Sequence, residues 1–495
     1  MTQIENVEES QDLEESFVSL EIEPESETTE MTTTKIFTQR KTENPLSYDL
    51  LNEWKIKFKK EPKNILAQNA FAKHPILDII GKSDIDTYVK DQFLFNITVD
   101  TIGSPAFLNN QKSSGRCWIF ASSNIFRTHV IKNYNLKDDE FQVSQSYLYF
   151  YDKLEKANYF LENICETVDE PLDSRLISYL NTAPVNDGGQ WDMIVNLVNK
   201  YGIVPNEVFP DNAQSTASAK LNYIVTEKLR EFGLELRNLI KSDATASTID
   251  QFKLDAMQTI HKIITLALGT PPNPDDKFVW EFIDKDGKYK HFETTPLDFF
   301  KNHVKYDAEA HFSLIHDPRN DYDTLYTVDR LNNVFNGKPI EYVNTQLDEI
   351  KECAIKMLKD NEPIFFGCDV GKFSDKTSGV LDTTAYDYET AFDFKLENTK
   401  SQRLRTGSSQ MTHAMVITGV HIDPISNLPV RWKIENSWGD ATGKKGWFMM
   451  TDEWFDEYVF QIVTTKKYAS KKAYDVWKSK EFNVLPYYDP MGALA

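Results

Sequence analysis

Residues 110–120 read Asn-Gln-Lys-Ser-Ser-Gly-Arg-Cys-Trp-Ile-Phe, a polar, glycine-containing stretch that turns apolar at Cys117. The pattern predicts a loop followed by a helix that opens at Cys117 and buries its apolar side chains. A thiol in the first turn of a helix feels the partial positive charge of unpaired backbone N–H groups, which stabilises the reactive thiolate. A single cysteine in such a place is more often a buried structural residue, so a catalytic assignment depends on partners elsewhere in the chain.

Three residues have the chemistry that would make Cys117 a nucleophile. Gln111, six positions upstream, can add a side-chain donor to the N–H of Cys117 and so bind the oxyanion of a tetrahedral intermediate. His413 heads an apolar, strand-like run, and Asn436 follows it by 23 positions. The asparagine oxygen can accept a hydrogen bond from one imidazole nitrogen and leave the other facing the thiol. Trp438 would shield that bond from water.

The order of these motifs resembles the papain-like cysteine peptidases: Gln, then Gly-x-Cys-Trp, then His-Ala, then Asn-Ser-Trp-Gly. In that family a glycine pair lines the substrate cleft. Here Gly188 and Gly189, within Asp-Gly-Gly-Gln-Trp-Asp at 187–192, are therefore expected to offer backbone groups to an extended peptide. Ser114 stands where secreted members of the family carry a disulfide-bonded cysteine, which fits a reducing compartment.

The long separation between nucleophile and base narrows the resemblance. His413 lies 296 positions after Cys117, which is about twice the roughly 130–150 of papain-like enzymes. A domain-sized insertion is therefore expected between the two lobes. From about residue 45 to its end the chain resembles the bleomycin hydrolase family. The matching stretches are LAQNAF (66–71), NQKSSGRCWIF (110–120), FQVSQSYLYFYDKLEK (141–156), NDGGQWDM (186–193), FFGCDVGK (365–372), MTHAMVITGV (411–420) and DPMGALA (489–495).

This resemblance implies a homohexamer that encloses its active sites and needs no metal or organic cofactor. The C-terminal arm would enter the cleft of its own protomer, where the carboxylate of Ala495 would restrict substrates to peptides with a free amino end. The implied activity is that of a cysteine aminopeptidase, and members of the family also hydrolyse the bleomycin amide and homocysteine thiolactone. Some members bind DNA, but the formal charge of −21 argues against nucleic-acid binding here.

The composition favours a cytosolic protein with reduced thiols. No run of eighteen apolar residues could span a membrane, and the first thirty residues lack the features of a secretory signal. Four cysteines, none at zinc-ligand spacing, are too few for a disulfide framework in 495 residues. Residues 1–34 hold eleven acidic and no basic side chains, which predicts a disordered acidic tail.

The predicted fold class is α+β, a papain-like two-lobed fold with a helical lobe and an antiparallel β lobe, a large, mostly helical insertion and a C-terminal arm. Helical periodicity marks 48–59, 218–241 and 249–268, and strand-like runs cluster from about 363 to 465. The predicted segments are a disordered acidic tail (1–40), an N-terminal segment and helical lobe with Cys117 (41–205), a helical insertion (206–362), a β-rich lobe with His413 and Asn436 (363–470) and an arm that enters the active site (471–495).

Two other functions fit parts of the pattern. Transglutaminases and arylamine N-acetyltransferases also transfer acyl groups through a Cys–His pair, but their third residue is Asp, which Asn436 does not match. A peptidase fold kept only as a nucleic-acid-binding or scaffolding shell would be expected to have lost catalytic residues. Cys117, His413, Asn436 and Gln111 are all present, which favours an active enzyme.

Overall fold

The computed structural model describes residues 46–82, 93–100, 109–137 and 141–493. The chain forms two compact units, one ending at Ala72 and one beginning at Lys73. The predicted acidic tail (1–40) and Ala495 lie outside the described residues. In the first unit, α1 (Tyr48–Lys60) is the amphipathic helix expected over 48–59, and α2 (Pro62–Phe71) follows it directly.

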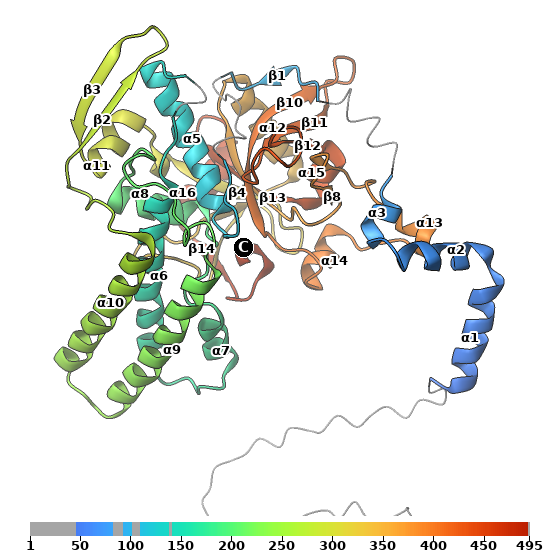
Figure 1. Cartoon of the computed structure of the whole chain (residues 1–495), viewed down its shortest axis with the longest axis horizontal. Coiled ribbons are helices and arrows are strands. Elements are labelled where there is room, and N and C mark those ends of the chain that lie inside the picture. The colour runs from blue at the N-terminus through green and yellow to red at the C-terminus, as the bar shows by residue number, and fades with distance from the viewer. Residues whose placement is uncertain (1–45, 83–92, 101–108, 138–140, 494–495) are drawn as a thin grey trace, which may run out of the picture. The chain divides into compact units, whose positions relative to one another are not determined.

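The helical layer of the second unit is built around α5 (Cys117–Tyr134), whose side chains are almost all buried. Both α6 (Gln145–Glu166) and α8 (Trp191–Tyr201) pack against it, and Figure 1 shows the three helices together on one side of the sheet. The first turn of α6 is capped by Ser144, whose hydroxyl accepts the N–H of Tyr147 at 3.0 Å. Because α6 and α8 both pack against it, the helix that carries Cys117, α5, is held inside the helical layer.

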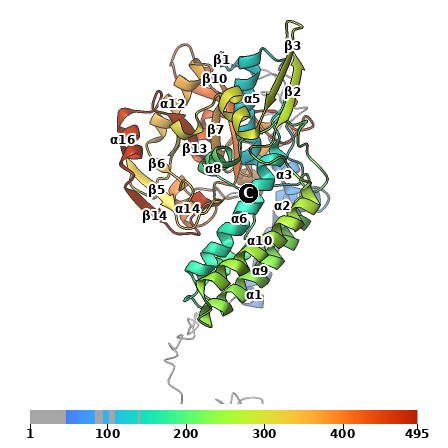
Figure 2. The same ribbon diagram turned by 90° about the vertical axis from the view of Figure 1, so that its left-hand side faces the viewer.

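Two long helices of the insertion, α9 (Ala219–Lys241) and α10 (Ala246–Leu268), lie beside α6, as Figure 2 shows. Their buried residues recur every three or four positions, which places them on one face of each helix. These residues are Leu221, Val225, Leu229, Gly233, Leu236 and Arg237 on α9 and Ala256, Ile260, Ile264 and Leu268 on α10. Both helices lie where their apolar periodicity predicts them.

Beyond Leu268 the insertion differs from the helical expectation over 206–362. A hairpin of β2 (Phe278–Ile283) and β3 (Tyr289–Thr294) comes first. The strands β4 (His311–Ile315), β5 (Thr324–Val328) and β6 (Tyr342–Asn344) then join the main sheet. Strands β4 and β6 are short and buried on both faces, so they lack the alternation of apolar and polar residues by which a half-buried strand is recognised.

The main sheet runs in the order β14-β5-β6-β4-β13-β7-β10-β11-β12-β9-β8, with β1 (Ile97–Thr98) paired to β10. Most neighbours are antiparallel, as predicted for this lobe, and β4–β6, β12–β9 and β14–β5 are parallel. The remaining strands are β7 (Ile364–Cys368), β8 (Ser374–Asp375), β9 (Val380–Leu381), β10 (His413–Ile422), β11 (Pro429–Glu435), β12 (Trp447–Thr451), β13 (Val459–Thr465) and β14 (Phe482–Leu485).

Shorter helices complete the second unit. They are α3 (Ile76–Ile80), α7 (Arg175–Thr182), α11 (Pro296–Asp298), α12 (Leu347–Lys359), α13 (Tyr388–Phe392), α14 (Lys400–Arg405), α15 (Asp452–Tyr458), α16 (Lys471–Ser479), a π-helical turn (Phe299–Val304) and the 3₁₀ turns η2 (Ala308–Ala310) and η3 (Pro490–Gly492). None of the helices in the described ranges is both long and apolar enough to cross a bilayer.

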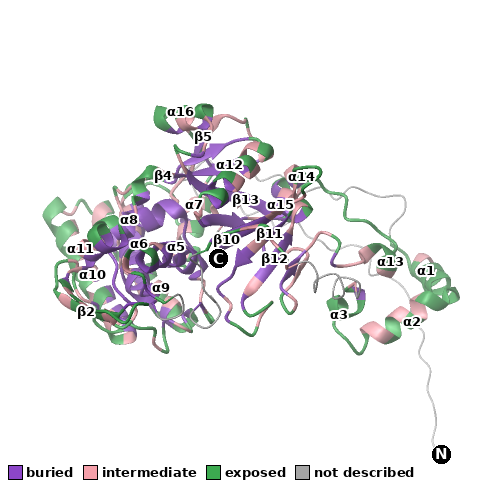
Figure 3. Ribbon diagram, turned by 90° about the horizontal axis from the view of Figure 1, so that it is seen from above, coloured by how far each residue is buried: buried purple, intermediate pink, exposed green. Residues whose placement is uncertain are grey.

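Strand β10 separates two apolar cores. Ala414 and Val416 belong to the core shared with α5, and Met415 and Ile417 belong to the core on the opposite face. Figure 3 shows the buried residues concentrated in α5, α6, α8 and the central strands, with exposed residues on the outer helices. The N-terminus of α5 and the first residues of β10 thus meet at the boundary between the helical layer and the sheet.

Candidate active site

Cys117 is the first residue of α5, and its side chain is 1% exposed. Arg116 occupies the N-cap position without a side-chain capping hydrogen bond. The first N–H groups of the helix therefore have no side-chain acceptor from the cap residue. Backbone groups of Ala414, Trp118 and Cys117 itself hydrogen-bond to the sulfur and lower the pKa of the thiol, which also places Cys117 against the start of β10.

His413 and Asn436 are brought together as the sequence predicts. His413 opens β10, Asn436 directly follows β11, and the two strands are paired neighbours. His413 Nε2 lies 2.9 Å from Asn436 Oδ1, which also accepts the N–H of Ser437 at 2.8 Å. The Trp438 ring is tilted by 35° against the imidazole, with 5.0 Å between the ring centres. Trp438 thus packs against the His413 ring, beside the bond that the sequence predicts it to shield.

Burial controls the charges of the two reactive groups. It raises the pKa of the Cys117 thiol to about 11, against the opposing effect of the backbone groups. It also lowers the pKa of His413 to about 4, although the bond to Asn436 acts in the opposite direction. The backbone groups at the start of α5 still lower the pKa of the thiol, in the direction that the sequence predicts for a helix terminus. The desolvation of the sulfur outweighs the favourable backbone groups.

Gln111, the predicted oxyanion donor, lies in the loop that leads to Cys117. Its Oε1 accepts the hydroxyl of Ser437 at 2.6 Å, and its backbone N–H donates to Ser437 O at 2.9 Å. One N–H of its Nε2 donates to Ser114 O at 2.5 Å. In the described part of the chain no second acceptor binds this amide, so its other hydrogen can serve a substrate oxygen.

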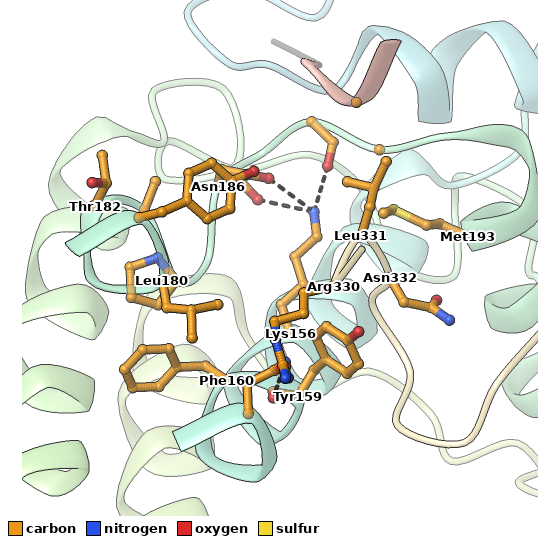
Figure 4. Close-up of a pocket in the computed structure, with 17 residues that line it drawn as sticks. Lys156, Tyr159, Phe160, Leu180, Thr182, Asn186, Met193, Arg330, Leu331 and Asn332 are labelled. Atoms are coloured by element: carbon orange, nitrogen blue, oxygen red, sulfur yellow. Dashed lines mark hydrogen bonds between the residues drawn. The ribbon is translucent and has the colours of Figure 1, made fainter. Parts of the chain in front are cut away.

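Gly189 of the glycine pair lies directly against the indole of Trp118. A Cβ on Gly189 would lie 2.5 Å from that ring, which only glycine avoids. Lys156 fixes the neighbouring turn, because its Nζ donates to Gly188 O at 2.5 Å and to Asn186 O at 3.0 Å. Beside the pair is a cavity of about 170 Å³ that Gly492 of the C-terminal segment also lines. Figure 4 shows Lys156 reaching across this cavity towards Asn186.

The C-terminal segment is anchored between the two layers. Met491 is fully buried, and its carbonyl accepts Gln190 Nε2 at 3.4 Å and the hydroxyl of Tyr342 at 3.3 Å. The N–H of Met411 donates to Pro490 O at 3.2 Å. Since Gln190 directly follows Gly189, the described part of the arm ends next to the glycine pair. Ala495, the predicted contact for the substrate's amino end, lies outside the described residues.

Two residues at the site were not singled out by the sequence. Ser437 holds both the backbone and the side chain of Gln111, and Asp187 binds the N–H of Gly115 at 2.9 Å. Asp187 could have been suspected, because a charged residue next to two cleft-lining glycines needs buried partners. Ser437 carried no such signal, since a serine in a loop is usually solvated.

Comparison with known proteins gives the same family. The model described as "Peptidase C1-like family" matches residues 45–492. Bleomycin hydrolase of Rattus norvegicus is 42% identical, over 89% of this chain and 96% of its own. "Cysteine proteinase 1, mitochondrial" of Saccharomyces cerevisiae is 42% identical, over 90% of this chain and 92% of its own.

A solved structure agrees with these sequence matches. The crystal structure of PepW from Lactobacillus rhamnosis superposes with a TM-score of 0.86 at 39% identity, covering 91% of this chain and 99% of PepW. The chain therefore belongs to the peptidase C1-like family, has its papain-like α+β fold, and is a cysteine peptidase of the bleomycin hydrolase type.

Proposed function

We propose that the chain is an aminopeptidase that removes residues from peptides with a free amino end. The observation that carries the proposal is the anchored C-terminal segment. Met491 is held beside Gln190, and Gly492 lines the cavity next to Gly188 and Gly189. Ala495 is three positions beyond Gly492 in the sequence, and the proposal is that its carboxylate reaches the substrate cleft. A carboxylate there attracts a substrate ammonium and leaves no room for a longer upstream chain.

The catalytic cycle starts with proton transfer from the Cys117 thiol to His413. Each charge alone is disfavoured by burial, but the two charges form together, and their mutual attraction offsets part of the desolvation cost. The thiolate then attacks the carbonyl of the first residue, and the N–H groups of Cys117 and Gln111 bind the oxyanion. His413 gives its proton to the leaving amine, and a water activated by His413 hydrolyses the thioester. Asn436 keeps the imidazole in orientation.

The same acyl chemistry covers two further substrates. The bleomycin amide and homocysteine thiolactone both present a carbonyl near a free amine, so we include them in the proposal. The rat relative is named a bleomycin hydrolase, which supports the first substrate. Incubation with each compound, followed by mass spectrometry of the products, tests this extension. Unchanged bleomycin after complete turnover of an aminoacyl amide would restrict the enzyme to peptides.

A homohexamer in the cytosol completes the proposal. Apolar side chains on α1, including Leu51, Trp54, Ile56 and Phe58, are exposed in the single chain and are suited to contact with another copy. Light scattering after gel filtration should give about six times the 57.2 kDa of one chain.

The yeast relative is named mitochondrial, so fractionation of cells decides between cytosol and mitochondrion. We expect no DNA retention in a gel shift at low salt, because the net charge is −21.

The decisive experiment compares one peptide with a free and with an acetylated amino end. The proposed function predicts cleavage of the free peptide from its N-terminus and little cleavage of the acetylated one. Cys117→Ser should remove activity on both, because a serine hydroxyl lacks the acidity of the thiol. Equal cleavage of both peptides would show an endopeptidase and refute the proposal, and activity of Cys117→Ser would refute the mechanism.

A further inference from the structure

A single buried carboxylate, that of Asp187, connects three separate parts of the molecule. Its side chain is 8% exposed. It accepts hydrogen bonds from the nucleophile loop, from α6 and from the start of α9. The donors are the N–H of Gly115 at 2.9 Å, Tyr149 Oη at 3.0 Å, Lys153 Nζ at 2.6 Å, Asn222 Nδ2 at 2.7 Å and the hydroxyl of Ser218. No step of the proposed reaction uses this group.

Asp187 forms hydrogen bonds with residues on both sides of the nucleophile in the sequence. Its carboxylate binds the N–H of Gly115, two positions before Cys117. Its backbone carbonyl accepts Trp118 Nε1, one position after Cys117, at 2.7 Å. The same residue leads directly into Gly188, at the edge of the cleft. A displacement of Asp187 would therefore move the nucleophile, its N–H and the glycine pair together.

The inserted helix α9 approaches this carboxylate with its N-terminus. Ser218 is the N-cap residue of α9, and Asn222 lies in its first turn. The positive end of the helix dipole thus faces a negative charge, the favourable arrangement. The segment before α9 also pairs with the nucleophile loop, because Ser113 N donates to Thr216 O at 2.9 Å and Ser218 N to Ser113 O at 3.3 Å.

The carboxylate is charged in the folded protein. Burial acts to raise the pKa of Asp187, but the Lys153 ammonium and the hydrogen-bond donors hold it well below the usual range of an aspartate. The charge acts on the nucleophile in turn, as one of the causes that raise the pKa of the Cys117 thiol. Replacing Asp187 by a neutral residue therefore changes an electrostatic quantity that can be measured on the thiol itself.

We propose that Asp187 is a positioning residue for catalysis, through which helix α9 of the insertion holds the loop that orients Cys117. The insertion then does more than pack against the outside of α6, because it also supports the loop that carries the nucleophile. The inference rests on Cys117 being the nucleophile of the proposed function. It does not depend on the preference for free amino ends.

The main test is Asp187→Asn, which keeps the size of the side chain and removes its charge. The turnover number on an aminoacyl fluorogenic amide should fall about 100-fold, the effect of misplacing a reacting group by about 1 Å, with KM changed much less. The pH midpoint of Cys117 alkylation by iodoacetamide should move down, because a nearby negative charge is lost. Alkylation needs no substrate, so it gives a result even if the proposed specificity is wrong.

A matched control is Asp192→Asn. Asp192 is also buried and paired with a lysine, Lys338 Nζ at 2.7 Å, but it bonds to the N–H of Glu341 and not to the nucleophile loop. This variant should leave the alkylation midpoint where it is. If both variants lower turnover equally and neither moves the midpoint, Asp187 contributes only stability and the proposal is overturned.

A second variant, Asn222→Ala, tests the connection through α9 and serves if Asp187→Asn fails to fold. It removes one hydrogen bond at the far side of the carboxylate, so turnover should fall about 10-fold, the effect of one such bond. Thermal unfolding of each variant shows that the comparison is made on folded protein. Turnover within threefold of the unchanged protein in Asn222→Ala would overturn the connection through the Asn222–Asp187 bond.

Discussion

Cys117 and His413 are both buried, and burial acts on their charges in opposite directions. It raises the pKa of the thiol to about 11 and lowers the pKa of the imidazole to about 4. Between these two values the pair holds one proton, which burial favours on the sulfur, and the thiolate–imidazolium form arises by transfer of that proton to His413. The pH range over which the thiolate–imidazolium form is accessible is therefore wide, and its limits belong to the pair.

The first prediction concerns the acid limit of this range. Below the pKa of His413 both groups are protonated and the thiolate is lost, so alkylation of Cys117 should fall with a midpoint well below the usual imidazole value of ~6.5. Lys376 lies over the Trp438 ring at 4.7 Å, and its charge lowers the pKa of His413. Lys376→Ala should therefore move the midpoint up.

The control for this prediction is Lys372→Ala, which removes a lysine four positions earlier in the chain that is not among the causes of the His413 shift. A midpoint near 6.5 in the unchanged protein would contradict the effect of burial. An unchanged midpoint in Lys376→Ala would contradict the effect of the lysine.

The second prediction concerns Asn436. Asn436→Ala removes the acceptor that lies 2.9 Å from His413 Nε2, and this bond becomes charge-assisted when the imidazolium forms. Such a bond contributes about 1.5–3 kcal/mol, so turnover should fall about 10- to 100-fold. Asn436→Asp keeps an acceptor and should retain more activity. Equal turnover numbers for the alanine and aspartate variants would show that the bond does not orient the base.

The residues proposed for the reaction can be singled out in the sequence because each belongs to a short local pattern. Cys117 follows a glycine-containing loop, and Asn436 lies in Asn-Ser-Trp-Gly. Asp187 and Lys376 act through space, on Gly115 and on Trp438, across 72 and 62 positions of sequence. No local spacing encodes such contacts, so only the structure could reveal them.

At the scale of elements, a helix or strand can be located from the sequence when one of its faces is buried and the other is exposed. Helices α9 and α10 have one buried and one exposed face, which gives the apolar periodicity that locates them. Strands β4 and β6 are buried on both faces and have no such period. The sequence therefore predicts a helical insertion over these residues, although the two strands extend the sheet beside β13.

The third prediction concerns the contact between the glycine pair and α5. A Cβ on Gly189 would meet the Trp118 indole at 2.5 Å, and the indole is fixed by its bond to Asp187 O. Gly189→Ala should therefore lower the free energy of unfolding by about 1–3 kcal/mol, the usual cost of overpacking, and reduce turnover as well. Urea unfolding and a fluorogenic assay measure the two effects.

Gly371→Ala is the control, because its Cβ would meet its nearest neighbour only at 3.8 Å. Equal stability of the two variants would contradict the argument.

At the scale of the whole molecule, the arm connects the last strands of the chain to the cleft. Arg319 holds it through Asp489, at 2.7 Å, and Asp489 binds the N–H of Met491 at 2.9 Å. Met491 is itself fully buried. Removing the chain from Met491 onward would therefore disturb the core, and the effect on specificity could not be separated from the effect on folding.

The fourth prediction uses a shorter truncation, after Gly492, which leaves these anchors in place. Loss of residues 493–495 moves the terminal carboxylate back by three positions, to Gly492, away from the place proposed to bind the substrate ammonium, and opens the upstream cleft. The kcat/KM for free aminoacyl amides should fall about 10- to 100-fold, the effect of one charge-assisted hydrogen bond, and acetylated peptides should become substrates. Ala495→Gly, which keeps both length and carboxylate, should behave like the unchanged chain. If the truncated enzyme still rejects acetylated peptides, the preference for free amino ends arises from the body of the cleft and not from the arm.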